Sequence, residues 1–314
     1  MQVGLHNLTL ALHTDSLRIQ DEWAKLFAPF LGGEGGAEIR LHLTIAQMPA
    51  PPAGRPSYAQ PDLAVYPTGD NFIIHLHRLG QLRVRPAAGR AEGVITPAAL
   101  EAYGAFEDIN AIALVPLLRR RNYVLIHAFA AARNGRALLL VGDCGSGKTT
   151  TGLALLAAGW KLLANDSPLL GEQGGRVMAH AYPGRLSVHA DALRRIPALR
   201  PLANDCELVS KPGWKMVFAA EDRFASPWAQ SAPVEAICLL KLDAAAAGHR
   251  LEVLSPAEAL GRTLPHSIDR WDQETLAFQI DLLHKLIQQA PTYRLHLGPD
   301  VPALPELLEA LVIG

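Results

Sequence analysis

The sequence is poor in cysteine and has no excess of charge of either sign. Its 314 residues include three cysteines and carry a formal net charge of −1 at neutral pH. A sparse, odd set of cysteines without a C-x-x-C pair argues against a disulfide framework and against a zinc site. The balanced charge argues against a chain that coats nucleic acid or an anionic membrane, so we expect neither as a partner.

Long apolar runs are also missing. No stretch reaches the roughly 20 apolar residues that a transmembrane helix needs, and residues 1–20 lack a cationic start followed by a long apolar core. We therefore expect a cytoplasmic protein that buries a substantial core as one large domain or two. The sequence leaves open whether it forms a homo-oligomer.

Residues 1–121 are rich in strand patterns and contain no motif with recognisable chemistry. Residues 37–44 alternate between apolar and polar side chains, which is typical of a half-buried strand. Residues 71–77 and 81–85 also alternate, and the short turn between them predicts a β-hairpin. We interpret this region as a strand-rich α+β unit of unknown role.

The rest of that region supplies a loop, a helix and a pair of histidines. Residues 86–97, rich in proline, glycine and small residues, are interpreted as a loop, and residues 99–121 as a long helix. His75 and His77 lie on one strand face and could bind a metal together. With no third ligand in sight, a solvated strand face is the better interpretation.

Residues 122–314 contain the one strong motif, Gly142-Asp143-Cys144-Gly145-Ser146-Gly147-Lys148-Thr149. An apolar run at 137–141 precedes it, and a helix pattern that stops at Gly159 follows it. The spacing G-x-x-x-x-G-K-[ST] between a strand and a helix is typical of a phosphate-binding loop, whose glycines let the backbone curl around an anion. We predict that Gly142 to Thr149 and the adjacent Thr150 bind ATP.

The residue types of the motif predict separate roles. Lys148 would reach the β- and γ-phosphates, and the Thr149 hydroxyl would hold magnesium. The start of the helix would add unpaired N–H groups and the positive end of its dipole. Upstream, residues 123–130 form a buried strand pattern, and the turn Asn134-Gly135 joins it to the loop strand. Such turns connect antiparallel neighbours, so we expect a hairpin here rather than an all-parallel sheet.

A transferred phosphate also needs a carboxylate that orders magnesium and handles the acceptor. Asp166 follows the strand pattern 160–164, at the edge where α/β sheets gather their ligands, and we assign it this role and a magnesium-ligand role. Asn165-Asp166-Ser167-Pro168 is also turn chemistry, so a purely structural role for Asp166 stays open. Asp243, at the end of another apolar run, is the competing candidate for magnesium.

Three further residues are candidates on weaker grounds. His127 lies on the strand paired with the loop strand and could approach the phosphates, although a lone histidine there is more often a core residue. Arg185 and Lys211 lie beside glycine or proline in the region after Asp166 and could steady the charge of a transferring phosphate. The alternative for each cation is an ordinary surface charge.

Several of these segments together are similar to the C-terminal domain of bacterial HPr kinase/phosphorylase, a fold related to the phosphoenolpyruvate carboxykinases. The resemblance implies an α/β P-loop domain with a mixed sheet over residues 122–314. It also implies ATP and Mg²⁺ binding at the loop, with Asp166 as the second carboxylate of an Asp-Asp pair and His127 nearby. The residues that carry it are Ile126-His127, 138–142, the loop, 159–164 and Asn165-Asp166, and residues 290–295 are similar to the closing strand of HPr-kinase-related proteins of unassigned substrate.

Two features depart from that family's pattern. Asn165 stands where the first Asp of the pair is expected, and an amide oxygen can bind magnesium but cannot act as a base. The downstream Arg-Gly-x-Gly signature has no match. The chain therefore resembles the scaffold rather than an enzyme specific for HPr, and a scaffold does not fix a substrate.

We expect an ATP- and magnesium-dependent kinase that acts on a hydroxyl of a peptide, protein or small molecule. Lys148 and the loop amides would hold the phosphates, and Asp166 would orient or deprotonate the acceptor. One alternative is a nucleotide-binding regulatory or assembly protein without transfer activity, which Asn165 favours. The other is a plain P-loop ATPase that uses Asp243.

Overall fold

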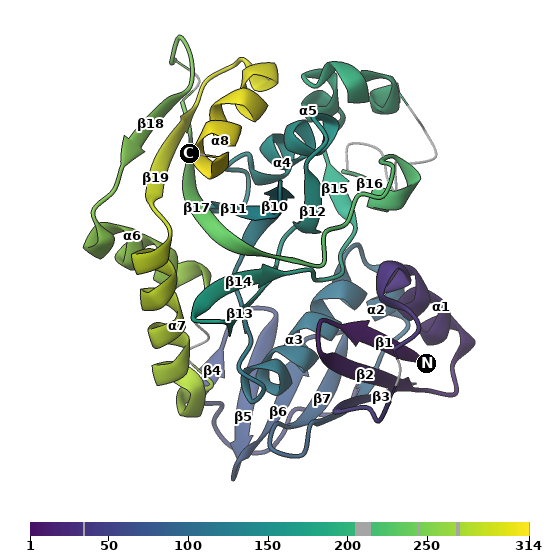
Figure 1. Cartoon of the computed structure of the whole chain (residues 1–314). Coiled ribbons are helices and arrows are strands. Elements are labelled where there is room, and N and C mark those ends of the chain that lie inside the picture. The colour runs from purple at the N-terminus through teal and green to yellow at the C-terminus, as the bar shows by residue number, and fades with distance from the viewer. Residues whose placement is uncertain (34, 205–214, 244, 268–270, 314) are drawn as a thin grey trace. The chain divides into compact units, whose positions relative to one another are not determined.

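The computed structural model describes residues 1–33, 35–204, 215–243, 245–267 and 271–313 (Figure 1). The chain divides into two compact units. Unit 1 consists of Met1–Val124 and Asp269–Ala277, and unit 2 consists of Leu125–Ile268 and Phe278–Gly314. From sequence we placed one boundary near residue 121 and assigned everything after it to the second region. The second, shorter part of unit 1 had no signal in the sequence.

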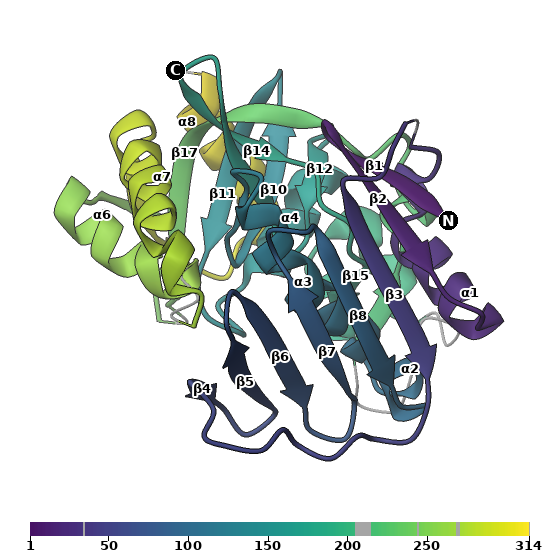
Figure 2. The ribbon, with the colours of Figure 1, turned by 90° about the horizontal axis from the view of Figure 1, so that it is seen from below.

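Unit 1 is built on one mixed sheet. Its strands are β1 (Gln2–Leu5), β2 (Leu8–His13), β3 (Ile39–Ile45), β4 (Tyr58–Ala59), β5 (Leu63–Thr68), β6 (Asn71–Leu76), β7 (Gly80–Arg85) and β8 (Arg90–Ile95). They lie side by side in the order β1-β2-β3-β8-β7-β6-β5-β4 (Figure 2). The pairs β2–β3 and β3–β8 are parallel, and the other neighbours are antiparallel.

The strand patterns of this unit were only partly predictable. The hairpin expected at residues 71–77 and 81–85 is confirmed by β6 and β7. The loop expected at residues 86–97 is wrong, because β8 occupies the middle of it and pairs with both β3 and β7. A Cβ at Gly93 would collide with the Leu82 side chain, so close packing between strands accounts for a glycine that looked like a loop residue.

The helices of unit 1 are short apart from α3. They are α1 (Leu17–Leu26), α2 (Ala98–Glu101) and α3 (Ala105–Arg119), with 3₁₀ turns η1 (Ala28–Phe30) and η6 (Gln273–Thr275). The single helix expected at residues 99–121 is divided, because Gly104 adopts a left-handed φ of 70° between α2 and α3. Helix α3 packs against β7 and β8 and covers one face of the sheet there.

A buried ion cluster explains why residues 271–277 belong to unit 1. The Asp272 carboxylate, fully buried, lies 3.3 Å from Arg119 Nη1 and 2.7 Å from Arg120 Nη1 at the end of α3. The Arg119 guanidinium also lies over the Trp271 ring, whose edge meets Phe72 of β6. Two cations at a helix C-terminus thus hold a distant carboxylate in place.

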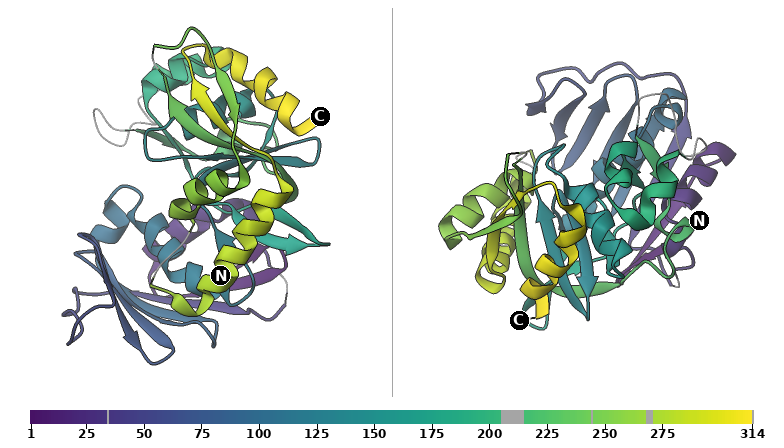
Figure 3. Two further views of the ribbon diagram at one scale, coloured as in Figure 1. Left: turned by 90° about the vertical axis from the view of Figure 1, so that its left-hand side faces the viewer. Right: turned by 90° about the horizontal axis from the view of Figure 1, so that it is seen from above.

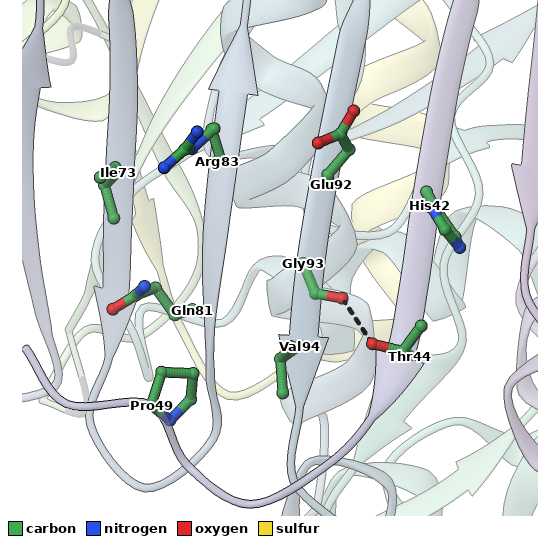
Figure 4. A pocket seen from close by; sticks show the side chains of 9 residues that line it. All are labelled: His42, Thr44, Pro49, Ile73, Gln81, Arg83, Glu92, Gly93 and Val94. Carbon is green, nitrogen blue, oxygen red and sulfur yellow. Dashed lines mark hydrogen bonds between the residues drawn. The ribbon is translucent and has the colours of Figure 1, made fainter.

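A pocket of about 270 Å³ lies on the sheet of unit 1, and Figure 4 shows the residues that line it. Its polar lining includes His42 and Thr44 of β3, Arg83 of β7 and Glu92 of β8, and the Thr44 hydroxyl donates to Gly93 O at 3.5 Å. These side chains alternate along their strands with fully buried residues such as Leu43 and Leu82. They therefore lie on the face of the sheet opposite the apolar core.

Unit 2 is a mixed α/β structure whose main sheet runs β12-β10-β11-β17-β14-β13, with β19 beside β17 and β18 beside β19. The strand β9 (Val124–Leu125) lies at the unit boundary, and β15 and β16 form a separate antiparallel pair. The strand bounds are β10 (Ala128–Arg133), β11 (Arg136–Val141), β12 (Lys161–Ala164), β13 (Leu169–Gln173), β14 (Arg176–His180), β15 (Leu186–Val188), β16 (Met216–Phe218), β17 (Ser231–Leu242), β18 (Arg250–Val253) and β19 (Thr292–Leu297).

The directions of the central strands confirm the expected mixed sheet. Strand β11 pairs antiparallel with β10 and parallel with β17, and β17 pairs parallel with β19. The turn Asn134-Gly135, with φ of 51° and 74°, makes the hairpin between β10 and β11 that the sequence predicts. The carboxyl ends of β11, β17 and β19 therefore meet at one edge of the sheet.

Helices and 3₁₀ turns complete unit 2. Helix α8 packs against β11, β17 and α4 (Figure 3). Among the described residues, no helix is long and apolar enough to cross a membrane. The bounds are α4 (Lys148–Ala157), α5 (Ala190–Arg194), η2 (Pro197–Asn204), η4 (Ala220–Asp222), α6 (Pro256–Thr263), η5 (Leu264–His266), α7 (Leu276–Gln289, from Phe278 on in unit 2), η7 (Val301–Ala303) and α8 (Leu304–Ile313).

Candidate functional site

The candidate site is centred on the Gly142–Thr149 loop of unit 2, which connects β11 to α4. Gly147, at the N-cap of α4, has a left-handed φ of 100°, and Gly145 has a φ of 82°. No side chain caps the first turn of α4, so no side chain competes for its first N–H groups. A backbone of this shape beside an uncapped helix start can accept an anion.

Lys148 is buried within this loop, with 6% of its surface exposed. Its ammonium donates to Gly142 O at 2.6 Å and Asp143 O at 3.2 Å, and lies 3.0 Å from Nε2 of His127. Burial lowers the pKa of Lys148, and the nearby Asp166 opposes that shift. The lysine thus occupies a site with little solvent and with acceptors supplied mainly by its own loop.

His127 connects the loop lysine to Asp166. It precedes β10, whose first residue Ala128 pairs with Val141 at the end of the loop strand. Its Nδ1 lies 3.3 Å from Oδ2 of Asp166, and its Nε2 faces the Lys148 ammonium. A protonated lysine can only donate, so Nε2 must be the acceptor, and the proton of the neutral ring is then on Nδ1 and directed at Asp166.

Asp166 reaches this position through the sheet. It follows β12, the antiparallel neighbour of β10, and its backbone oxygen accepts a hydrogen bond from Ala128 N at 2.9 Å. The side chain remains about half exposed, at 53%. Asp166 therefore combines a structural position with proximity to the loop. Its backbone continues the sheet, while its carboxylate faces His127.

Asn165 is buried beside Asp166, with 8% of its surface exposed. Its side-chain amide donates to Arg185 O at 3.0 Å, and its buried Oδ1 has no hydrogen-bond partner among the residues that the structure describes. Buried polar atoms that lack a partner within the protein are uncommon, and water or an ion usually binds to them. Asn165 Oδ1, the Asp166 carboxylate and the Thr149 hydroxyl are all hard oxygen donors, and this donor set fits Mg²⁺.

Of the two candidate cations, Arg185 and Lys211, only Arg185 lies within the described residues. Arg185 contacts the site through its backbone oxygen, which Asn165 holds, while its side chain is exposed. Lys211 lies outside the described residues. Lys215, which follows that gap, is close enough to contribute to lowering the pKa of Lys148.

The competing carboxylate, Asp243, directly follows β17. Strand β17 pairs Leu239 with Val141 in parallel, so Asp243 lies at the same edge of the sheet as the loop. Its carboxylate lies 3.9 Å from Nδ1 of His296. Asp166 and Asp143 are the carboxylates that raise the pKa of Lys148 against the effect of burial.

One residue of the site was missed from sequence. His266, at the end of η5, accepts a hydrogen bond from the backbone N–H of His127 at 2.7 Å through its own backbone oxygen. Its ring lies parallel to the ring of His127, with centroids 6.4 Å apart and an interplanar angle of 17°. The sequence around a single histidine after a short helix does not indicate that this histidine packs beside the loop.

The histidine pair of unit 1 has other partners. His75 Nδ1 lies 3.2 Å from Gln81 Oε1, and His77 Nδ1 lies 2.8 Å from Pro61 O. Within the part of the chain that the structure describes, no group of three or more His, Cys, Asp or Glu side chains is arranged to hold a metal ion.

Comparisons with solved structures include a distant similarity in fold. No protein-family model matches the chain, and no curated protein is similar to it in sequence. A solved structure titled "Structure of the Hpr(Ser) kinase/phosphatase from Coxiella burnetii" is 14% identical, with a TM-score of 0.31, over 60% of this chain and 92% of that chain. A similarity of this size assigns neither family nor function, so function must be argued from the contacts of the site.

Proposed function

We propose that this protein transfers the γ-phosphoryl group of ATP to a hydroxyl group of a peptide, protein or small molecule, on a fold of the HPr-kinase type. The observation that supports the proposal most directly is the continuous connection from Lys148 through His127 to Asp166. A lysine in a glycine-rich loop suits phosphate binding, and a half-exposed carboxylate beside it suits an acceptor hydroxyl.

Phosphate binding would use the loop and its lysine. The loop N–H groups and the start of α4 would surround the β- and γ-phosphates, and Lys148 would exchange its contacts with Gly142 O and Asp143 O for phosphate oxygens. Thr149, Asn165 and Asp166 supply oxygen ligands for Mg²⁺, which would offset phosphate charge. Asn165 enters this set because its buried Oδ1 has no partner among the described residues.

Transfer requires that the acceptor lose a proton. The acceptor oxygen would form a bond to the γ-phosphorus while the bond to the β–γ bridging oxygen breaks, and the hydroxyl proton would pass to the Asp166 carboxylate. His127 Nδ1–H would orient that carboxylate through the 3.3 Å contact. ADP leaves with Lys148 still beside its β-phosphate.

The direct test is incubation of the protein with ATP labelled in the γ-phosphate and a fractionated cell extract. The proposal expects label in a hydroxyl-bearing acceptor, and none with Lys148→Ala. Nucleotide binding without label in any fraction would contradict transfer.

A nucleotide-binding regulatory protein without transfer activity is the second candidate, and Asn165 favours it. The Asn165 amide cannot act as a base, and its N–H₂ group is occupied by Arg185 O. The variant Asn165→Asp separates the two. Transfer that appears only in this variant supports the regulator, whereas transfer by the unmodified chain supports the kinase.

A further inference from the structure

His266 reaches the candidate site from a part of the chain far from the loop. It ends η5, directly after α6, and its ring lies parallel to that of His127. Since His127 Nε2 lies 3.0 Å from the Lys148 ammonium, the two imidazoles and the lysine form one cluster at the mouth of the loop. The role assigned above to His127 makes no use of the second ring.

The backbone around His266 is held firmly. Thr263, fully buried at the end of α6, donates its hydroxyl to Ala259 O at 2.8 Å. On the other side, the Ser267 hydroxyl donates to Thr263 O at 3.2 Å. Together with the bond from His127 N to His266 O, these contacts fix the backbone of His266 relative to His127.

The groups that influence the pKa of His266 belong to the candidate site. Burial lowers the pKa of His266, and the neighbouring His127 and Lys148 lower it further, while Asp143 of the loop raises it. These are the titratable groups that the ring faces, from the loop, from α4 and from the segment before β10. A polyphosphate would add negative charge and favour the protonated ring.

We propose that the His266 side chain binds the terminal phosphate of the nucleotide, next to Lys148. This inference rests on the proposed function, because it requires a nucleotide in the Gly142–Thr149 loop. The imidazole of His266 would bind the phosphate in addition to Lys148 and the loop N–H groups. It would become protonated as the nucleotide binds and donate an N–H to a phosphate oxygen. ADP lacks the γ-phosphate and therefore cannot make this contact.

A purely structural role for His266 makes a different prediction. Its hydrogen bond to His127 uses the backbone oxygen, which any residue supplies. If that bond were the whole contribution, replacing the side chain would leave nucleotide binding unchanged, or would weaken ATP and ADP equally through disturbance of His127.

The test is titration calorimetry with Mg²⁺ and either ADP or the β,γ-imido analogue of ATP, between pH 5.5 and 8.5. It compares the unmodified chain with His266→Gln, His266→Lys and the control His284→Gln, which alters an exposed histidine of α7. Protonation of the nucleotide itself is the same for every variant, so differences between variants report on the protein.

We expect His266→Gln to weaken the triphosphate analogue about tenfold at pH 6 and to leave ADP unchanged. The preference of the unmodified chain for the triphosphate should fall as pH rises through the bound-state pKa of His266. His266→Lys should keep that preference at all pH values tested, and His284→Gln should behave as the unmodified chain.

Equal weakening of both nucleotides by His266→Gln, or no change in either, would overturn the inference and leave the proposed function standing. Failure of the unmodified chain to bind any nucleotide would instead overturn both.

Discussion

The Lys148 ammonium and His127 Nε2 lie 3.0 Å apart, and this contact determines how the loop is held before any ligand arrives. The same ammonium donates to Gly142 O and Asp143 O. The loop is therefore closed on its own lysine, and an incoming phosphate must compete with two backbone oxygens and a ring nitrogen. In return, a bound phosphate would act as a counterion in direct contact with the buried Lys148 ammonium.

Replacement of Lys148 by Ala should reduce affinity for ATP at least a hundredfold, because it removes the loop's buried cation. Lys161→Ala is the matched control, since Lys161 is in the same unit and bonds only to the backbone oxygens of Ala225 and Ser226. Calorimetric titration with MgATP measures both. Equal affinities for the two variants would remove Lys148 from the site.

Helix α4 should be sensitive to a single methyl group at Gly152. A Cβ there would collide with the ring of Phe129 on β10, which is fully buried and cannot withdraw. We expect Gly152→Ala to lower the free energy of unfolding by about 1–3 kcal/mol and to weaken nucleotide binding by shifting α4.

The control for this change is Gly261→Ala in the exposed part of α6, where a Cβ meets nothing. That variant should be neutral or stabilising by up to about 1 kcal/mol. Denaturant unfolding followed by circular dichroism gives both values. If Gly152→Ala is as harmless as Gly261→Ala, the close packing of α4 on β10 is wrong.

The two described cysteines should react differently with thiol reagents. Cys144 is exposed in the loop, whereas Cys238 on β17 is fully buried and its burial raises the pKa of its thiol. In a Cys206→Ser background, a maleimide at pH 8 should modify Cys144 in the folded protein and Cys238 only after unfolding. MgATP should slow the reaction at Cys144, and an unchanged rate would place the nucleotide elsewhere.

In unit 1, Asp272→Asn should be strongly destabilising. It removes the charge of a fully buried carboxylate that pairs with the Arg119 and Arg120 guanidinium groups, at a cost of about 3–5 kcal/mol. Glu274→Gln, which alters an exposed carboxylate on Arg120, should cost less than about 1 kcal/mol. The measurement is denaturant unfolding followed by circular dichroism. Similar losses for both variants would contradict this account.

Local signals predicted the elements around the loop. The Asn134-Gly135 turn fixes an antiparallel partner for the loop strand, and Gly159, with a left-handed φ of 87°, ends α4 where the sequence indicates. Ser255, whose hydroxyl accepts a hydrogen bond from Glu258 N, caps α6 through an equally local contact. These features depend on a few adjacent residues, which is why they can be read from the chain.

The missed features depend on tertiary contacts. Gly93 resembled a loop residue until the Leu82 side chain beside it was known. His266 and Asp272 each pack against residues far away in sequence, and a single His or Asp in a turn gives no sign of such a partner. The choice between Asp166 and Asp243 as the magnesium ligand stays a prediction, because both follow strands whose carboxyl ends approach the loop.

The central claim is that Asp166 is the carboxylate that acts with the loop, and the pair Asp166→Asn and Asp243→Asn tests it most directly. The measurement is the rate at which γ-labelled ATP loses its terminal phosphate to acceptor, with MgATP affinity measured in parallel. We predict that Asp166→Asn slows transfer about 10²–10⁴-fold and lowers MgATP affinity less than Lys148→Ala does, and that Asp243→Asn leaves the rate nearly unchanged. A rate abolished by Asp243→Asn and unaffected by Asp166→Asn would contradict the account.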